Sequence, residues 1–427
     1  MMGSVIMKKA LLVVPHQDDE INLAGNIIDK IKENFDLYIL YSSLDSREEE
    51  ARIRKQEAYD ACSVWNVDRN HIIFLEYPDS PNKNGHHFYT DGDHRIVDDI
   101  EQYILELRPE IIFATDFDYH SDHRMLSLAF DTAMGRVLKK NNGYYPIVLK
   151  GFCYETAFYG PEDYKASKPE RALSEREVLS NCSFEWKNRV SVLGNEKPGV
   201  IWSRKAYKAL KQHKSQYAVL HARSIINADN VFWLKRTDNL LNGASITVSI
   251  GNAELLRDYK VIDTNDIITK DPRSIDYSDA VWFPGVGKNK IEIIWDEEKE
   301  FDSIVVHGNP NNDKEINVNI SVYANDERIG KINTLSSYGR DTKINVSQVK
   351  AKRMIVDIDN KNTDFGISEL EIFNGDIEFP TVIDDKTEVF VREHILLDLF
   401  DRVGYKFIVL KTKVIRKLNK LKLCGFW

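Results

Sequence analysis

Short apolar runs alternate with longer amphipathic stretches through the first half of the chain. The apolar runs lie at Ala10–Val14, Leu37–Ser42, Ile72–Leu75, Ile111–Thr115 and Ile147–Tyr154. Between them, apolar residues recur at helical spacing at Asp19–Glu33, Ser46–Val64, Ile96–Leu107 and Ser121–Lys140. Strands that alternate with helices are typical of βαβ units and a parallel sheet. The pattern therefore predicts an α/β domain over residues 1–225, with a Rossmann-like parallel sheet and helices on both faces.

The pattern changes after about residue 240 to short runs in which every second residue is apolar. These runs lie between Asn, Asp and Gly clusters at Ser245–Ile250, Lys290–Trp295, Ser303–His307, Asn317–Tyr323, Arg353–Asp357 and Ser368–Phe373. Such alternation with frequent turn signals predicts an all-β sandwich. We expect this second domain at residues 241–378, joined to the first by a linker at residues 226–240.

The last segment, residues 379–427, is helical in pattern and basic in charge. Apolar residues recur at helical spacing from Ile395 to Val403, and the chain from Arg402 to its end has eight Lys and Arg and no Asp or Glu. A basic amphipathic helix of this kind is suited to the surface of an anionic membrane. The alternative is a helix that packs on the protein's own acidic body.

Composition narrows the class of protein. The 427 residues are 42% hydrophobic and 29% charged, which excludes a collagen-like, disordered or multi-span membrane chain. The net charge of −9 leaves no broad basic surface for a nucleic-acid backbone, so we expect no nucleic-acid partner. The apolar run Ala10–Pro15 is too short for a signal peptide, and we expect a cytoplasmic protein, with peripheral contact at the inner membrane surface if the basic helix binds lipid.

The four cysteines offer no paired chemistry. Cys62, Cys153, Cys182 and Cys424 form no C-x-x-C pair, so they fit neither a disulfide framework nor a thiolate zinc site. Reduced, mostly buried thiols are the expected state. A search for a metal site is therefore directed to His and Asp.

Two clusters of ionisable residues follow predicted strands of the first domain. The first strand leads into Pro-His-Gln-Asp-Asp-Glu at residues 15–20, and His-Ser-Asp-His at residues 120–123 follows the strand Ile111–Thr115. The carboxyl ends of parallel strands meet at one edge of the sheet, and His and Asp are ligands that zinc accepts. Either cluster alone also fits a helix cap or a surface loop. Together they predict a metal site.

These two motifs resemble those of the PIG-L/LmbE-like zinc-dependent N-deacetylases. Further similarity lies in Arg54-x-x-Glu57 and in the stretch from Lys208 to Gln216, which includes His213, so that the resemblance covers about residues 8 to 220. Two departures stand out. Gln17 replaces the common Pro, and residues 43–46 stand where many relatives have a Gly-rich turn, which bears on the shape of the substrate pocket.

The resemblance implies a role for each residue of the two motifs. His16, Asp19 and His123 would hold Zn²⁺, or another divalent ion such as Fe²⁺, and Asp18 would be the general base. His120 would stabilise the oxyanion or act as an acid. Asp122 would orient an imidazole.

Other residues are assigned less directly. The family position of Arg54 contacts substrate, although Arg54 also fits an ion pair with Glu50 or Glu57 on a helix surface. Tyr154 is a second substrate-binding candidate because it ends a predicted strand. His213, on a helical face, fits a structural role. The loop at residues 82–95 is rich in His and Asp but shows no metal-ligand spacing, so it is expected to be a surface loop or a substrate-facing lid.

The β-rich half has a weaker resemblance to a discoidin-type, galactose-binding-like sandwich. The fragments that carry it are Val281–Phe283, Lys290–Trp295, Arg353–Val356 and Gly366–Phe373. Such domains often bind glycans through loop aromatics, for which the candidates are Trp282, Phe283 and Tyr338. The alternative is an inert domain whose aromatic residues fill the core.

The sequence as a whole predicts a metal-dependent hydrolase that removes the N-acetyl group from an N-acetylated amino sugar of the GlcNAc type. The substrate would be a glycoconjugate or a lipid-linked glycan. An amidase acting on another sugar-containing metabolite is one alternative. A non-catalytic glycan-binding protein is the other.

Overall fold

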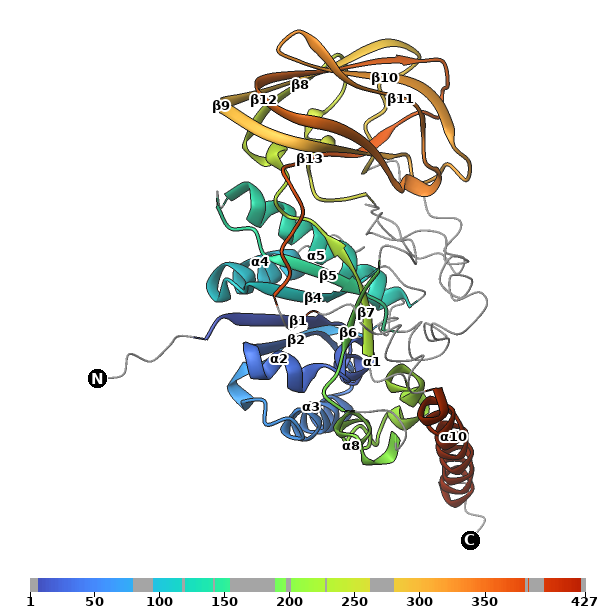
Figure 1. Ribbon diagram of the computed structural model, residues 1–427. Helices are drawn as coiled ribbons and strands as arrows, with labels where there is room; N and C mark the ends of the chain where they lie inside the picture. Colours follow the sequence, from blue (N-terminus) through green and yellow to red (C-terminus); the bar gives the residue numbers. More distant parts are fainter. Residues whose placement is uncertain are drawn as a thin grey trace, which may run out of the picture.

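The structure is a computed structural model, and Figure 1 shows its two sheets and its C-terminal helix. It describes residues 7–79, 95–116, 120–140, 143–153, 189–196, 201–226, 229–261, 280–380, 383 and 395–423. Every structural statement below concerns these residues.

The N-terminal half is built on a seven-stranded sheet in the order β3-β2-β1-β4-β5-β7-β6. Its strands are β1 (Lys9–Val14), β2 (Asp36–Leu44), β3 (Ile72–Pro78), β4 (Ile111–Thr115), β5 (Ile147–Gly151), β6 (Arg189–Leu193) and β7 (Asp229–Lys235). The first five strands are parallel, and β7 and β6 extend the sheet in the antiparallel sense. The five predicted strands are present.

Helices cover both faces of this sheet, as predicted. Ala10, Leu12 and Val14 of β1 belong to one hydrophobic core, whereas Leu11 and Val13 belong to another, because successive side chains of a strand point to opposite faces. The first core is covered by α1 (Asp19–Ala24), α2 (Ile28–Asn34), α3 (Glu48–Ser63), α8 (Lys205–Leu210) and the 3-10 segment η4 (Ala218–Ile225). The second is covered by α4 (Arg95–Leu107) and α5 (Ser121–Lys140).

Two details of the first domain correct the sequence prediction. The single helix expected at Asp19–Glu33 is broken at Gly25, where a side chain would meet Ile21 at 2.6 Å. The linker expected at residues 226–240 is wrong in part, because β7 lies within it and pairs with β5 and β6. Six of the seven residues of β7 are buried, so this apolar segment gains more from the sheet than from an exposed connection.

The C-terminal half is an antiparallel β-sandwich, as predicted. Its strands are β8 (Ala244–Val248), β9 (Gly287–Gly308), β10 (Ile316–Ala324), β11 (Glu327–Leu335), β12 (Asp341–Asn360) and β13 (Ile367–Phe373). Two runs expected as separate strands, Lys290–Trp295 and Ser303–His307, are parts of the long strand β9. Register shifts between Asn345 and Val349 let β9 and β12 bend together, and a hydrophobic core fills the space between the layers.

The aromatic residues proposed for glycan binding differ in their environment. Trp282 is 1% exposed, belongs to the sandwich core and donates its indole N–H to the carbonyl of Ile250 at 2.6 Å. It is therefore a core residue and not a binding-loop aromatic. Phe283 is 41% exposed, and the side chain of Tyr338 lies outside the described residues.

The two domains contact each other through polar and close-packed groups. The side chain of Asn239 donates to the carbonyl of Leu370 at 2.9 Å and accepts from the backbone of Ile372 at 3.0 Å. A side chain at Gly135 of α5 would meet the carbonyl oxygen of Asp258 at 2.2 Å, so the backbones touch here. The sandwich is thus packed against the first domain.

The C-terminal helix α10 (Ile395–Leu423) begins against the first domain and extends away from it (Figure 1). Among the described residues, no helix is both long and apolar enough to cross a membrane.

Candidate metal centre

The two predicted motifs meet at the point where the order of the strands reverses. Strand β1 lies between β2 and β4, and the chain leaves β1 toward one side of the sheet and later leaves β4 toward the other. The crevice at the carboxyl ends of two such strands is the usual ligand site of an open α/β sheet. His16, Asp18 and Asp19 follow β1, and His120, Asp122 and His123 follow β4 at the start of α5.

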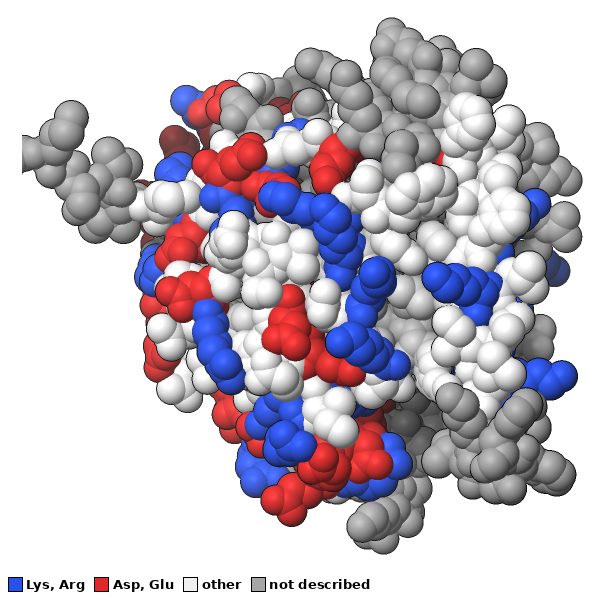
Figure 2. Space-filling model, turned by 90° about the horizontal axis from the view of Figure 1, so that it is seen from below, with Lys and Arg blue, Asp and Glu red and all other residues white. Residues whose placement is uncertain are grey.

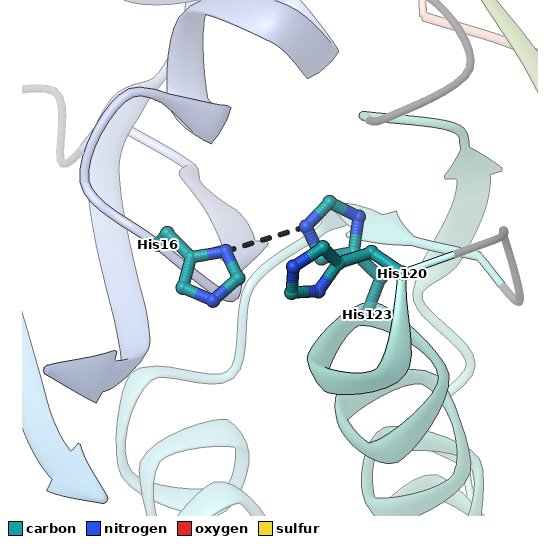
Figure 3. A group of neighbouring side chains, drawn as sticks. All are labelled: His16, His120 and His123. Carbon is teal, nitrogen blue, oxygen red and sulfur yellow. Dashed lines mark hydrogen bonds between the residues drawn. The ribbon is translucent and has the colours of Figure 1, made fainter. Parts of the chain in front are cut away.

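Three of these side chains bring one donor atom each to a common point. Nδ1 of His16 lies 3.0 Å from Oδ2 of Asp19, the same oxygen lies 3.2 Å from Nε2 of His123, and the two nitrogens are 3.3 Å apart. Four ligands about 2.1 Å from a tetrahedral zinc ion stand about 3.4 Å from one another. The donor triangle therefore fits a divalent metal ion with only small adjustment. In Figure 3 the ring of His16 faces that of His123, and a dashed line joins their two nitrogens.

The charges around the triangle favour a cation. Burial would lower the pKa of His16, but hydrogen bonds and charges from Asp122 and Asp19 outweigh it and raise this pKa to about 9. Burial would raise the pKa of Asp19, yet the charge of His123 and its hydrogen bond, with those of His16, hold it well below the ordinary value. Carboxylates that stabilise a positively charged imidazole this strongly also favour a divalent cation.

His16 is held from its other side by Asp122. Nε2 of His16 lies 2.9 Å from Oδ2 of the fully buried Asp122. With the proton on Nε2, the lone pair of Nδ1 is directed toward Asp19 and His123. Asp122 thus orients an imidazole, as expected, and that imidazole is His16.

Asp18 has an unusual backbone conformation. Its φ of 130° lies in a region that non-glycine residues rarely adopt. The buried carboxylate of Glu20 accepts the Asp18 N–H at 2.9 Å, and the other oxygen of Glu20 accepts from Nε2 of His213 at 2.8 Å. Oδ2 of Asp18 lies 3.3 Å from Nδ1 of His221. The hydrogen bond to Glu20 therefore stabilises the strained backbone of Asp18 beside the donor triangle.

His120 completes the group of imidazoles at the start of α5. Its ring centroid lies 5.0 Å from that of His16 and 4.7 Å from that of His123, and the three rings are shown together in Figure 3. The backbone N–H of Asp122 donates to Nδ1 of His120 at 3.2 Å. Neutral His120 therefore carries its proton on Nε2, which makes that atom a donor.

The comparison with protein families agrees with this geometry. Residues 11–134 match the family model "PIG-L: GlcNAc-PI de-N-acetylase", and this stretch contains both motifs. The chain therefore has a PIG-L domain at residues 11–134. No curated protein matches the sequence.

Solved structures show only partial likeness. An N,N'-diacetylchitobiose deacetylase from Pyrococcus horikoshii is 19% identical, over 39% of this chain and 67% of its own, with a TM-score of 0.28. The conserved protein TT1542 from Thermus thermophilus is 22% identical, over 32% and 59%, with a TM-score of 0.25. CpGH89CBM32-6 from Clostridium perfringens is 14% identical, over 32% and 100%, with a TM-score of 0.23. These scores are too low to bear on function.

Arg54 lies near the candidate metal centre, but its ion-pair partner is not one of the two that the sequence suggested. It is 6% exposed, and it pairs with Asp79 at 2.7 Å and not with Glu50 or Glu57. Oxygens of Asp79 and Asp122 and a ring nitrogen of His16 lie within 4.8 Å of one another, so Arg54 reaches the centre through Asp79. Among the described residues, the buried Oδ1 of Asp79 has no hydrogen-bond partner.

The departures at Gln17 and at residues 43–46 contact each other. Gln17 is fully buried and donates to the carbonyl of Ser43 at 2.7 Å, while the Ser43 hydroxyl donates to the carbonyl of Pro15 at 2.8 Å. Gln17 therefore ties the loop after β1 to the end of β2.

The remaining site candidates and the cysteines have different outcomes. Tyr154 and residues 80–94 lie outside the described residues. Cys62 and Cys153 are free and buried, as expected, and Sγ of Cys153 lies near the donors of Asp19 and His123. Sequence reasoning missed His221 and Asp79. Asp79 directly follows β3, so the rule that flagged the two motifs also applies to it.

Proposed function

We propose that the PIG-L domain is a metal-dependent hydrolase that removes the N-acetyl group from an N-acetylated amino sugar. The observation that carries the proposal is the donor triangle of His16, Asp19 and His123 beside the strained carboxylate of Asp18. The family match over residues 11–134 supports the same class of reaction. The substrate class is inferred from the family match alone.

The three donors would hold Zn²⁺ or another divalent ion such as Fe²⁺. When bound, the ion supplies Lewis acidity, which makes water a stronger nucleophile at neutral pH and polarises an amide carbonyl. An amide is a weak electrophile, so both effects are needed. Asp122 keeps Nδ1 of His16 directed toward the ion.

Asp18 is the proposed general base. Its carboxylate takes the proton of the attacking water and returns it to the leaving amine as the C–N bond breaks, so that acetate and a free amino sugar result. Such a shuttle contributes about 10²–10⁴ in rate. His221 contacts Oδ2 of Asp18 at 3.3 Å, and the hydrogen bond and charge of Asp18 outweigh burial to raise the pKa of His221. His221 therefore places a positive charge beside the base.

His120 is the proposed oxyanion donor. The N–H of Asp122 fixes Nδ1 of His120 as an acceptor, so the proton on Nε2 can be donated in a hydrogen bond to the carbonyl oxygen as negative charge develops there. Arg54 and Asp79 form the proposed sugar contact on the same rim, because they combine a guanidinium with a carboxylate oxygen that lacks a partner among the described residues.

The test measures metal content and acetate release with purified full-length protein and a panel of soluble N-acetylhexosaminides. We expect bound divalent metal and acetate release that a chelator abolishes. Asp18→Asn should keep the metal and lose about 10²–10⁴ in rate. Asp296→Asn, at an exposed carboxylate of β9, is the matched control and should change neither. Protein without metal, or full activity in Asp18→Asn, contradicts the proposal, and metal-loaded protein that binds glycans without releasing acetate supports the glycan-binding alternative.

A further inference from the structure

The helix α10 is anchored to the first domain along one face. The fully buried carboxylate of Asp401 pairs with Arg204, and Ile408 packs into the core of that domain. A side chain at Gly404 would meet the ring of Trp202 at 2.7 Å, so the helix backbone lies directly on this ring. These contacts fix which side of α10 faces the protein.

A second face of α10 is apolar and exposed. It begins with the adjacent pair Leu399 and Phe400 and continues every three or four residues, at Val403, Phe407, Leu410, Val414 and Leu418, and each of these side chains is between 45% and 69% exposed. This spacing places them on one stripe of an α-helix. An exposed apolar stripe of this length is typical of a surface that binds another protein or a membrane.

Basic residues accompany the apolar stripe. The stretch from Arg402 to Lys422 contains eight Lys and Arg and no Asp or Glu. Toward the right of Figure 2, where Figure 1 places α10, basic side chains stand among uncharged ones, while acidic and basic side chains are mixed toward the left. The helix therefore combines an apolar face with a strongly positive charge.

The charges decide between possible partners. Pairing two copies of this stripe would bring sixteen cationic side chains together with no acidic residue in the same stretch to offset them, since each copy carries eight. A helix that lies in the plane of an anionic bilayer satisfies both features, because its apolar side chains enter the acyl boundary and its Lys and Arg meet the lipid phosphates.

We propose that α10 docks this protein on the surface of an anionic lipid bilayer. The helix packs on η4, which carries His221, and His221 contacts Asp18. Docking through α10 therefore holds the membrane on the side of the first domain where the candidate centre lies.

The experiment is sedimentation of the full-length protein with vesicles of phosphatidylcholine alone or with about 30% phosphatidylserine, an anionic lipid. We expect binding to the anionic vesicles only, which weakens as salt is raised. Phe407→Glu should abolish it. Lys413→Gln with Lys417→Gln should lower the partition coefficient about 30-fold, whereas the matched pair Lys290→Gln with Lys331→Gln in the sandwich should leave it unchanged.

Three results overturn the proposal: no binding, equal binding to both kinds of vesicle, or a dimer in solution that Phe407→Glu dissolves. All the substituted side chains are exposed, so thermal melts should show native stability in each variant. Acetate release from a soluble sugar tests the proposed function separately, because variants of the α10 stripe should not change it.

Discussion

Asp122 accepts a hydrogen bond from Nε2 of His16 at 2.9 Å, while Nδ1 of the same ring lies 3.0 Å from Asp19. The two contacts fix the rotation of the ring, and the contact with Asp122 keeps a proton on Nε2. A carboxylate behind a ligand histidine also makes the ligand nitrogen more basic. Asp122 therefore belongs to the metal centre without being a donor of the triangle.

Asp122→Asn should weaken metal binding about 10- to 100-fold, because the amide keeps the shape of the carboxylate but removes its charge. Competition with a chromogenic chelator measures the affinity. Asp296→Asn, at the surface of the sandwich, controls for the loss of one charge. An unchanged affinity in Asp122→Asn would mean that His16 does not need this bond for its position.

Glu20 is a positioning residue, since it touches the backbone of Asp18 and not the crevice. Glu20→Gln leaves one acceptor oxygen for two donors, the N–H of Asp18 and Nε2 of His213. A hydrogen bond to a charged group contributes about 1.5–3 kcal/mol, so we expect kcat to fall about 10- to 100-fold. KM and metal content should stay unchanged. A residue that only supports folding would instead lower kcat, metal content and stability together. A proportional loss of kcat, metal and thermal stability would show that Glu20 only supports folding.

The carboxyl of Glu369 makes stability depend on pH at the junction of the two domains. Burial, followed by the charges of Asp258 and Glu371, raises its pKa well above the ordinary value. A group whose pKa is raised by folding stabilises the protein below its unfolded pKa of about 4.3 and loses that contribution as pH rises through the folded pKa.

Glu369→Gln should therefore raise the melting temperature at about pH 8 and raise it less at about pH 5, since Gln stays neutral at both. Calorimetry at the two values gives the difference. Glu371→Gln serves as the contrasting variant, because it removes the charge that faces Nε2 of His307 at 2.9 Å and should not stabilise. Equal shifts at the two pH values in Glu369→Gln would show that Glu369 is ionised in the folded protein.

The sequence predicts those residues of the metal centre whose position depends only on the strand or helix next to them in the chain. His16 and Asp19 directly follow a buried strand, and His123 stands in the first turn of a helix, so parallel pairing of β1 with β4 is enough to bring them together. His221 obeys no such rule. It lies in a 3-10 segment far along the chain from α5, and only the packing of that segment on α1 brings it to Asp18.

The same distinction explains the errors in the fold. Alternating patterns identify β8, β10 and β13, but in β11 the apolar residues Ile329 and Ile332 are three positions apart, so that no run has an apolar residue at every second position. The sequence suggests Trp282 as a binding aromatic only through the resemblance to a glycan-binding sandwich. Its burial depends on strand β13, to which it pairs at Ile367, and so on a contact between residues distant in the sequence.

The buried ion pair between Asp401 and Arg204 is one of the contacts that fasten α10 to the first domain, and its loss should loosen the helix. Arg204 also donates to the carbonyls of Ile225 and Ile226, so Asp401→Ala leaves the guanidinium with acceptors and lets α10 detach without unfolding the domain. We expect trypsin to cut at the lysines of α10 about tenfold faster, while the main thermal transition moves by only a few degrees. Asp326→Ala, at a side chain that is 91% exposed, is the control and should leave the cleavage rate unchanged. If the pair instead supports the whole domain, breaking it costs about 3–5 kcal/mol, and the melting temperature would fall together with the rise in cleavage.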